Sequence, residues 1–176
     1  MRLFTAITLP KEIKDKTSEI MRGRLPVPYI NTTNLHITLN FIGEVESEKV
    51  KNLINNFPIF LAQQKPFKIE FDKLQKFRQQ IHITLKPNFQ LEKLQSLLEE
   101  KLRLNGLKLE ERSYYPHVTL ANLHFDHVLN PQRKLELFPN KELEKLNFLA
   151  NVITLYESKL LLHHAHHESL IECILE

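Results

Sequence analysis

The chain contains little glycine, one cysteine and no long apolar run. Its three glycines, Gly23, Gly43 and Gly106, are too far apart to form either G-x-G-x-x-G or G-x-x-x-x-G-K-[ST]. Glycine-rich phosphate cradles are therefore excluded, so any phosphate must be held by side chains. The single Cys173 excludes an intramolecular disulfide framework and a cysteine-rich zinc site. No apolar run approaches the roughly 18 residues of a membrane span, and none is expected.

The length of 176 residues predicts one domain that spans the whole chain, 1–176. The first ten residues read as a strand that ends at Pro10 and not as a signal peptide, so we expect a cytoplasmic protein. The formal net charge of +3 comes from interspersed lysine, arginine and acidic residues, and it indicates nucleic-acid binding only weakly. Five basic residues flank a predicted strand pair and could form an RNA track, although a solvated face is the simpler interpretation: Lys65, Lys68, Lys73, Lys76 and Arg78.

Hydrophobic periodicity predicts an alternation of strands and helices. Strands are expected at 2–9, 35–42, 67–72, 79–86, 114–124, 151–161 and 168–175, with helices at about 10–21, 47–57 and 88–105. Pro58 is expected to end or kink the second helix, and Asn88 to cap the third. Two pairs of strands follow each other with short connections, which implies antiparallel pairing. The class is therefore α+β or mixed α/β, with helices packed on sheet.

Nine histidines are roughly twice the ordinary usage, and three of them begin copies of one tetrapeptide. The copies are His36-Ile37-Thr38-Leu39, His82-Ile83-Thr84-Leu85 and His117-Val118-Thr119-Leu120. Each copy lies in a predicted strand, where residues i and i+2 share one face. Every copy therefore presents a histidine and a threonine together, with apolar residues on the opposite face.

This pairing suits chemistry on a phosphate. Histidine gives or takes a proton near neutral pH, and a threonine hydroxyl can donate a hydrogen bond to a phosphate oxygen. Two such strands facing each other would supply a base, an acid and two hydroxyl donors around one anion. One histidine could activate water while the other protonates the leaving oxygen, and neither metal nor cofactor is required. One copy alone would be unremarkable in a β-strand, but three copies predict that at least two are functional.

Two of the copies, with their flanks, resemble the signatures of the 2H phosphoesterases. These are Asn34-Leu35-His36-Ile37-Thr38-Leu39 with the following Asn40-Phe41-Ile42-Gly43-Glu44-Val45, and Tyr115-Pro116-His117-Val118-Thr119-Leu120-Ala121. The first strand and the segment Leu155-Tyr156-Glu157-Ser158 are similar as well, so the resemblance covers essentially the whole chain. The branch it most resembles is the LigT/ThpR type, RNA 2′,3′-cyclic phosphodiesterases also called 2′-5′ RNA ligases.

The resemblance implies an α+β, bilobal fold with two pseudo-symmetric lobes, each with an antiparallel sheet and flanking helices, that face each other across a central cleft. It implies metal-independent hydrolysis of RNA or nucleotide 2′,3′-cyclic phosphates to 2′-phosphates, and in some members reversible 2′-5′ RNA ligation. His36 and His117 would be catalytic, with His36 protonating the departing 3′-oxygen and His117 activating water. Thr38 and Thr119 would hold the phosphate. We expect a monomer that acts on RNA or nucleotide ends, with no membrane partner.

The sequence departs from the family pattern at three places. His82 lacks the flanks of the other two copies, and we expect it to be structural or at the surface, with a role near the cleft as the alternative. Asn122 stands where many relatives have an arginine, which removes a charge and a bidentate donor. The cluster His163-His164-Ala165-His166-His167 replaces a glycine and an aromatic residue, and is expected to form a hairpin loop. His124 and His127, which follow the second motif, are expected to carry no function.

Two alternatives stay open at this point. The chain could be a non-catalytic RNA- or nucleotide-binding module on the same cleft. It could also hydrolyse another small substrate, such as 2′-5′ oligoadenylate or ADP-ribose cyclic phosphate.

Overall fold

The computed structural model describes residues 1–22, 29–111, 113–123, 141–160 and 165–176. Three α-helices, one 3₁₀ helix and eight strands are formed by these residues. They run β1 (Arg2–Thr8), α1 (Lys11–Met21), η1 (Thr32–Asn34), β2 (His36–Glu44), α2 (Ser47–Leu61), β3 (Phe67–Phe77), β4 (Gln80–Leu85), α3 (Phe89–Leu104), β5 (His117–Asn122), β6 (Asn147–Ala150), β7 (Val152–Leu160) and β8 (Ala165–Ile174).

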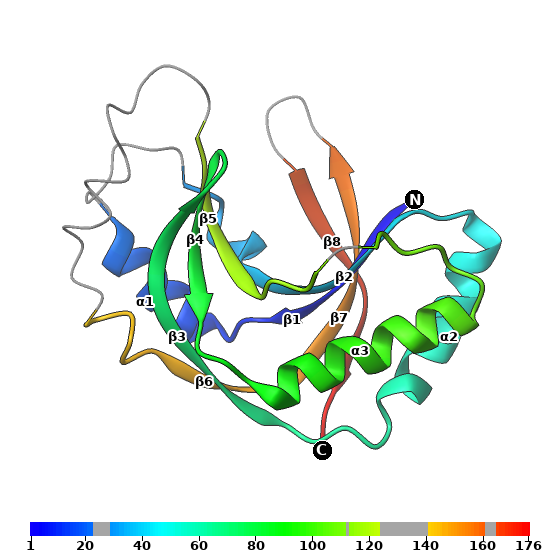
Figure 1. The fold of residues 1–176 in the computed structure, drawn as a ribbon. Helices are drawn as coiled ribbons and strands as arrows, with labels where there is room; N and C mark the ends of the chain where they lie inside the picture. Colours follow the sequence, from blue (N-terminus) through cyan, green and yellow to red (C-terminus); the bar gives the residue numbers. More distant parts are fainter. Residues whose placement is uncertain (23–28, 112, 124–140, 161–164) are drawn as a thin grey trace.

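The described strands form one eight-stranded sheet in the order β6-β3-β4-β5-β2-β1-β7-β8. Every pairing along it is antiparallel. The expectation of two separate sheets is corrected here, because β2 and β5 pair and join the strands into one. That junction is narrow, with the single register pair Ile37↔Val118. Figure 1 shows β3, β4 and β5 rising on one side of this junction and β7 and β8 on the other.

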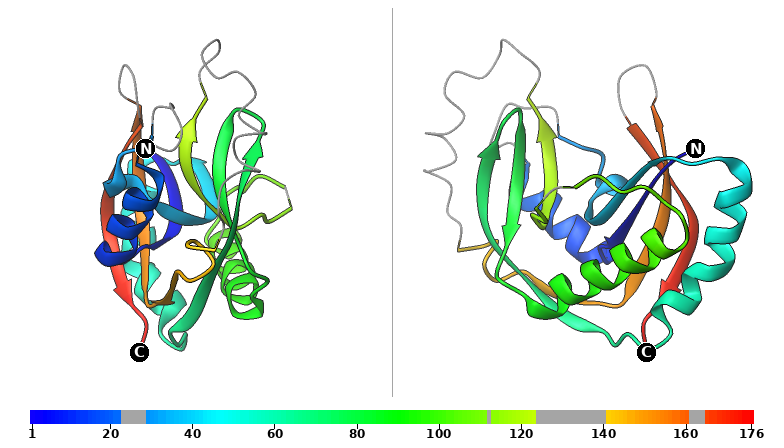
Figure 2. Two further views of the ribbon diagram at one scale, coloured as in Figure 1. Left: turned by 90° about the vertical axis from the view of Figure 1, so that its left-hand side faces the viewer. Right: turned by 45° about the vertical axis from the view of Figure 1, so that its right-hand side comes forward.

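Helices flank the sheet, as the apolar periodicity predicts. In the left view of Figure 2, α1 and α3 lie on opposite sides of the molecule. The Asn88 side chain accepts a hydrogen bond from the backbone N–H of Leu91 at 3.0 Å and so caps α3. α3 buries a stripe of leucines: Leu91, Leu94, Leu98 and Leu102. Pro58 lies inside α2 and does not end it, since the buried Phe57 and Leu61 on either side keep that helical turn packed.

Burial alternates along the two motif-bearing strands at the junction. Ile37 and Leu39 in β2, and Val118 and Leu120 in β5, are at most 3% exposed. The histidines and threonines between them are partly exposed on the opposite face. The two motifs therefore use one face for the core and the other for the site.

Two predicted segments differ from the structure near the C-terminus. The predicted strand at 151–161 is preceded by a further short strand, β6, whose Phe148 and Ala150 are buried and which pairs with β3. β8 begins at Ala165, so His166 and His167 belong to a strand that pairs with β7, while residues 161–164 lie outside the described part of the chain. None of the helices in the described residues has the length and apolar character needed to cross a membrane.

Candidate active site

The junction between β2 and β5 brings the two full motifs together. Ile37 pairs with Val118 in antiparallel register. One residue further in each direction, this register sets Thr38 beside His117 and His36 beside Thr119 on the face opposite the core. Both histidines and both threonines predicted from the sequence therefore lie in one two-by-two patch.

The backbone holds the two histidine rings in the same way. Nδ1 of His36 lies 2.6 Å from the carbonyl oxygen of Asn34, and Nδ1 of His117 lies 2.7 Å from that of Tyr115. A carbonyl oxygen can only accept a hydrogen bond, so each Nδ1 carries the proton and Nε2 is the basic nitrogen of the neutral ring. In both motifs the carbonyl belongs to the residue two positions before the histidine, which makes the anchor a local property of the strand.

The ring of His36 is enclosed by aromatic side chains. Its centroid lies 4.9 Å from that of Phe4, 6.1 Å from that of Tyr156 and 5.3 Å from that of His167, whose ring is edge-on. Phe4 is 3% exposed, so this wall belongs to the core. Nε2 of His36 also lies 3.1 Å from the Thr38 hydroxyl, which can donate to it.

The ring of His117 has a different neighbour, because His82 stacks on it. The two centroids are 3.9 Å apart with an interplanar angle of 15°. His82 is 2% exposed, so the surface position considered for it is wrong, and it contacts a proposed catalytic ring. Its companion Thr84 points instead to β3, where its single O–H lies 3.2 Å from two acceptors, the Asp72 carboxylate and the Lys73 carbonyl.

Burial controls the charge of two of these histidines. It lowers the pKa of His36 to about 4, against a smaller raising effect of the Asn34 carbonyl, and nearby His167, His117 and Lys14 lower the pKa slightly further. Burial also lowers the pKa of His82 to about 4, with a further contribution from His117. At neutral pH the unliganded site therefore contains two neutral imidazoles, His36 and His82.

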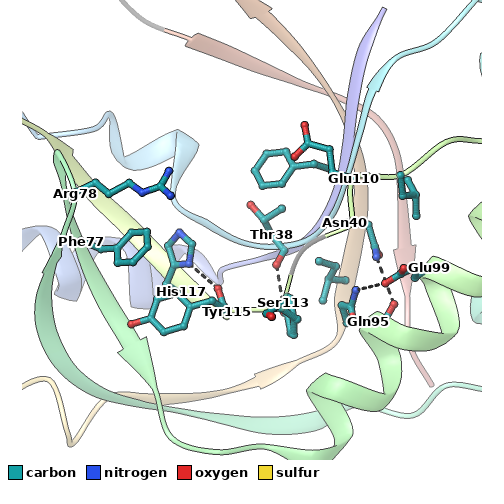
Figure 3. A pocket seen from close by; sticks show the side chains of 14 residues that line it. Thr38, Asn40, Phe77, Arg78, Gln95, Glu99, Glu110, Ser113, Tyr115 and His117 are labelled. Carbon is teal, nitrogen blue, oxygen red and sulfur yellow. Dashed lines mark hydrogen bonds between the residues drawn. The ribbon is translucent and has the colours of Figure 1, made fainter.

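A cavity of about 260 Å³ opens beside His117 (Figure 3). Thr38 and His117 line it, and so do the exposed aromatic rings of Phe77 and Tyr115. Arg78 is the cation among its described lining residues, and its guanidinium carbon lies 5.5 Å from the centre of the Phe77 ring. Of the five basic residues predicted as a possible RNA track, Arg78 is the one that lines this cavity.

Most of the remaining sequence predictions concern residues outside this centre, and His167 is the exception. Asn122, at the end of β5, accepts a hydrogen bond from the Gln80 side chain at 2.8 Å and does not line the cavity. His163 and His164, with His124 and His127, lie outside the described residues. The sequence predicts a loop at His167, whereas this residue lies in β8 and its ring makes an edge-on contact with that of His36. His167 lies at every-other-residue spacing from apolar residues at the end of β8, and this alternation was the signal in the sequence that could have indicated a strand.

Comparison with known proteins shows that the fold is that of a phosphoesterase. A family model described as the 2′-5′ RNA ligase superfamily matches residues 10–160. The chain belongs to this superfamily. It is similar to the RNA 2′,3′-cyclic phosphodiesterase of Methanocaldococcus jannaschii, with 32% identity over 91% of this chain and 92% of the relative. The corresponding protein of Bacillus subtilis is 29% identical over 67% of this chain and 69% of its own length.

Solved structures show the same fold. A crystal structure described as a phosphoesterase has a TM-score of 0.77 and 26% identity, and the match covers 99% of this chain and 97% of that one. E. coli LigT complexed with 3′-AMP has a TM-score of 0.75 and 25% identity over 99% of this chain and 97% of its own.

Proposed function

We propose that the chain is an RNA 2′,3′-cyclic phosphodiesterase that hydrolyses RNA or nucleotide 2′,3′-cyclic phosphates to 2′-phosphates. The observation that carries the proposal is the pair of matching histidine–threonine motifs on adjacent strands, each histidine anchored through Nδ1 to a carbonyl. The names of the M. jannaschii and B. subtilis relatives support it.

The reaction needs two proton transfers at one phosphorus. His117 takes a proton from water through Nε2 as the water oxygen bonds to phosphorus. The bond from phosphorus to the 3′-oxygen breaks, and His36 donates a proton to that oxygen, which leaves a 2′-phosphate. Thr38 and Thr119 donate hydrogen bonds to the non-bridging oxygens. The two histidines then exchange their protonation states with solvent, and no net proton is stored.

The low pKa of His36 describes the site without its anion. A bound cyclic phosphate carries negative charge, which favours the protonated form of a nearby imidazole. Substrate binding would therefore raise the pKa of His36 and prepare it as the proton donor. The neutral ring of His82 would lie flat against His117 as that ring becomes positive, a contact that stabilises a cation through the π face.

The same chemistry extends to ligation. If the 5′-hydroxyl of a second RNA replaces water, the same breakage of the bond to the 3′-oxygen joins the two RNAs through a 2′-5′ linkage. We propose this as a second reaction of the same site, measured by adding an acceptor RNA with a 5′-hydroxyl end.

Incubation with a nucleoside 2′,3′-cyclic phosphate in the presence of EDTA tests the main proposal. Phosphorus NMR separates the 2′-phosphate from the 3′-phosphate, and we expect the 2′-isomer alone. His36→Ala and His117→Ala proteins serve as controls against a contaminating nuclease. Binding of the cyclic phosphate without product would refute the proposed activity and favour a binding module, while turnover of 2′-5′ oligoadenylate alone would point to another substrate.

A further inference from the structure

The cavity beside His117 has an aromatic wall that proton transfer does not use. The rings of Phe77 and Tyr115 are stacked, with centroids 5.9 Å apart and an interplanar angle of 29°. The Tyr115 ring lies 5.5 Å from that of His117, so the wall leads directly to the proposed catalytic centre. Phe77 and Tyr115 are 46% and 42% exposed. Large aromatic rings usually lie in the core, so two stacked rings at a cavity mouth indicate a binding surface.

Local contacts hold this wall in place. The Tyr115 hydroxyl donates to the side-chain oxygen of Gln75, a residue of β3, at 3.1 Å. Phe77 ends β3, and the next residue, Arg78, has a left-handed backbone with φ of 52°. Such a conformation is uncommon for a residue other than glycine. In Figure 3 the Arg78 side chain lies over the Phe77 and His117 side of the cavity.

Charge is distributed unevenly across the cavity. Arg78, Phe77 and His117 lie on one side, and Glu99 and Glu110 lie on the other, with Thr38 between them (Figure 3). The hydrogen bond from Arg103, with a further one from Gln95, lowers the pKa of Glu99 and keeps its carboxylate ionised. A phosphate is therefore attracted to the Arg78 side, where the described lining of the cavity has no carboxylate. The interior suits a neutral, planar group.

We propose that this cavity binds the nucleobase of the nucleoside that carries the reacting phosphate, stacked on the Phe77–Tyr115 wall. The inference rests on the proposed function, since it places one part of that substrate. A volume of about 260 Å³ is close to the lower end of ordinary ligand pockets, roughly 300–1,000 Å³, and fits one nucleoside better than a longer RNA segment. Stacking accepts every base because every base has a π face.

Kinetic measurements on two substrates, one with a nucleobase and one without, test the inference. The substrates are adenosine 2′,3′-cyclic phosphate and methyl β-D-ribofuranoside 2,3-cyclic phosphate, which has no base. We expect Phe77→Leu and Tyr115→Leu each to raise KM for the adenosine substrate by roughly 5- to 100-fold, since one stacked base contributes on this scale. The same variants should change KM for the base-free substrate less than twofold. Tyr115→Phe keeps the ring and should restore much of the affinity that Tyr115→Leu loses.

Phe89→Leu is the matched control, because Phe89 is a 77% exposed phenylalanine at the start of α3 and does not line the cavity. Thermal unfolding of all variants checks that the fold is intact. An equal loss on both substrates, or no loss on the adenosine substrate, would overturn the inference and leave the proposed function standing.

Failure of the proposed function is separable from failure of the inference. If the wild-type chain hydrolyses neither substrate, equilibrium binding of adenosine 2′-monophosphate is compared with that of methyl riboside 2-phosphate. If Tyr115→Leu weakens binding of the adenosine ligand and leaves binding of the methyl riboside unchanged, the nucleobase site is still supported. Equal affinity of both ligands for the wild-type and variant proteins would refute it.

Discussion

The two halves of the candidate site share a backbone design and differ in their surroundings. His36 and His117 each donate from Nδ1 to the carbonyl two residues earlier, at 2.6 and 2.7 Å. His36 is then enclosed by Phe4, a ring of the core, and by His167. His117 faces an open cavity on one side and the flat ring of His82 on another.

This comparison separates what the motif determines from what the fold determines. The tetrapeptide and its strand set the ring orientation, and neighbouring strands set the environment of each ring. Burial lowers the pKa of His36 to about 4, so the enclosed half of the site is a region where charge is costly until a substrate anion arrives. The exposed aromatic rings of the open half are better suited to bind the rest of the substrate.

The largest expected effects test the feature that the halves share. His36→Ala and His117→Ala should each lower kcat/KM by about 10²–10⁴-fold, because each removes one proton transfer. The double variant should lose little more than either single variant if the two histidines act on one transition state. Hydrolysis of a nucleoside 2′,3′-cyclic phosphate is the measurement, and nearly full activity in either single variant would contradict the proposed pair.

The threonines should have smaller effects. Thr38→Ala and Thr119→Ala each remove a hydroxyl donor to the phosphate, worth on the order of tenfold to a hundredfold for a hydrogen bond to a charged group. Thr38→Ser and Thr119→Ser keep the hydroxyl and are the matched controls. Alanine variants as active as their serine counterparts would show that these hydroxyls do not bind phosphate.

Much of the fold, and the shared face of the histidine and threonine within each motif, follow from the sequence, because they depend on local patterns. Strand parity places His36 with Thr38 and His117 with Thr119, and the helix that Asn88 caps is where its leucine spacing predicts it. The strand β6 was missed because Asn147–Ala150 is short and its burial comes from pairing with β3, a long-range contact.

The stacking of His82 on His117 was missed for a similar reason. The pairing of β4 with β5 sets His82 opposite Thr119, diagonal to His117, and no local pattern in the sequence specifies that register. Likewise, the segment His163–His167 is predicted as a hairpin loop because it lies between two predicted strands, while the contact of His167 with His36 depends on the pairing of β8 with β7.

Substitutions of His82 test the difference between the two halves directly, because its ring stacks on that of His117 and not on that of His36. We expect His82→Leu to lower kcat about three- to tenfold, in keeping with the contribution of a partly desolvated cation–π contact. His82→Phe keeps a flat ring against His117 and should retain more activity than the leucine variant. Equal activity of the two variants would show that the ring face of His82 makes no contribution, and a loss as large as that of His117→Ala would instead assign it a direct catalytic role.

The smallest expected effect is a shift in the pH dependence of activity, and it arises from His36 in the enclosed half of the site. If His36 is the proton donor, activity requires its protonated form, so the rate falls as pH rises through the pKa of His36. The pH dependence of kcat/KM reports the free enzyme, where burial has lowered that pKa from 6.5 to about 4. The dependence of kcat reports the complex, where the phosphate anion raises the pKa again. The descending limb of kcat should therefore lie at higher pH than that of kcat/KM.

His167→Phe refines this test, because it keeps a ring against His36 and removes a neighbour whose charge lowers the pKa of His36. The descending limb of kcat/KM should move slightly toward higher pH in this variant, with kcat at its optimum little changed. His166→Phe, one residue earlier on β8, is the control. A limb that moves toward lower pH, or limbs of kcat and kcat/KM that coincide in the wild-type protein, would argue against His36 as the donor and favour His117 in that role.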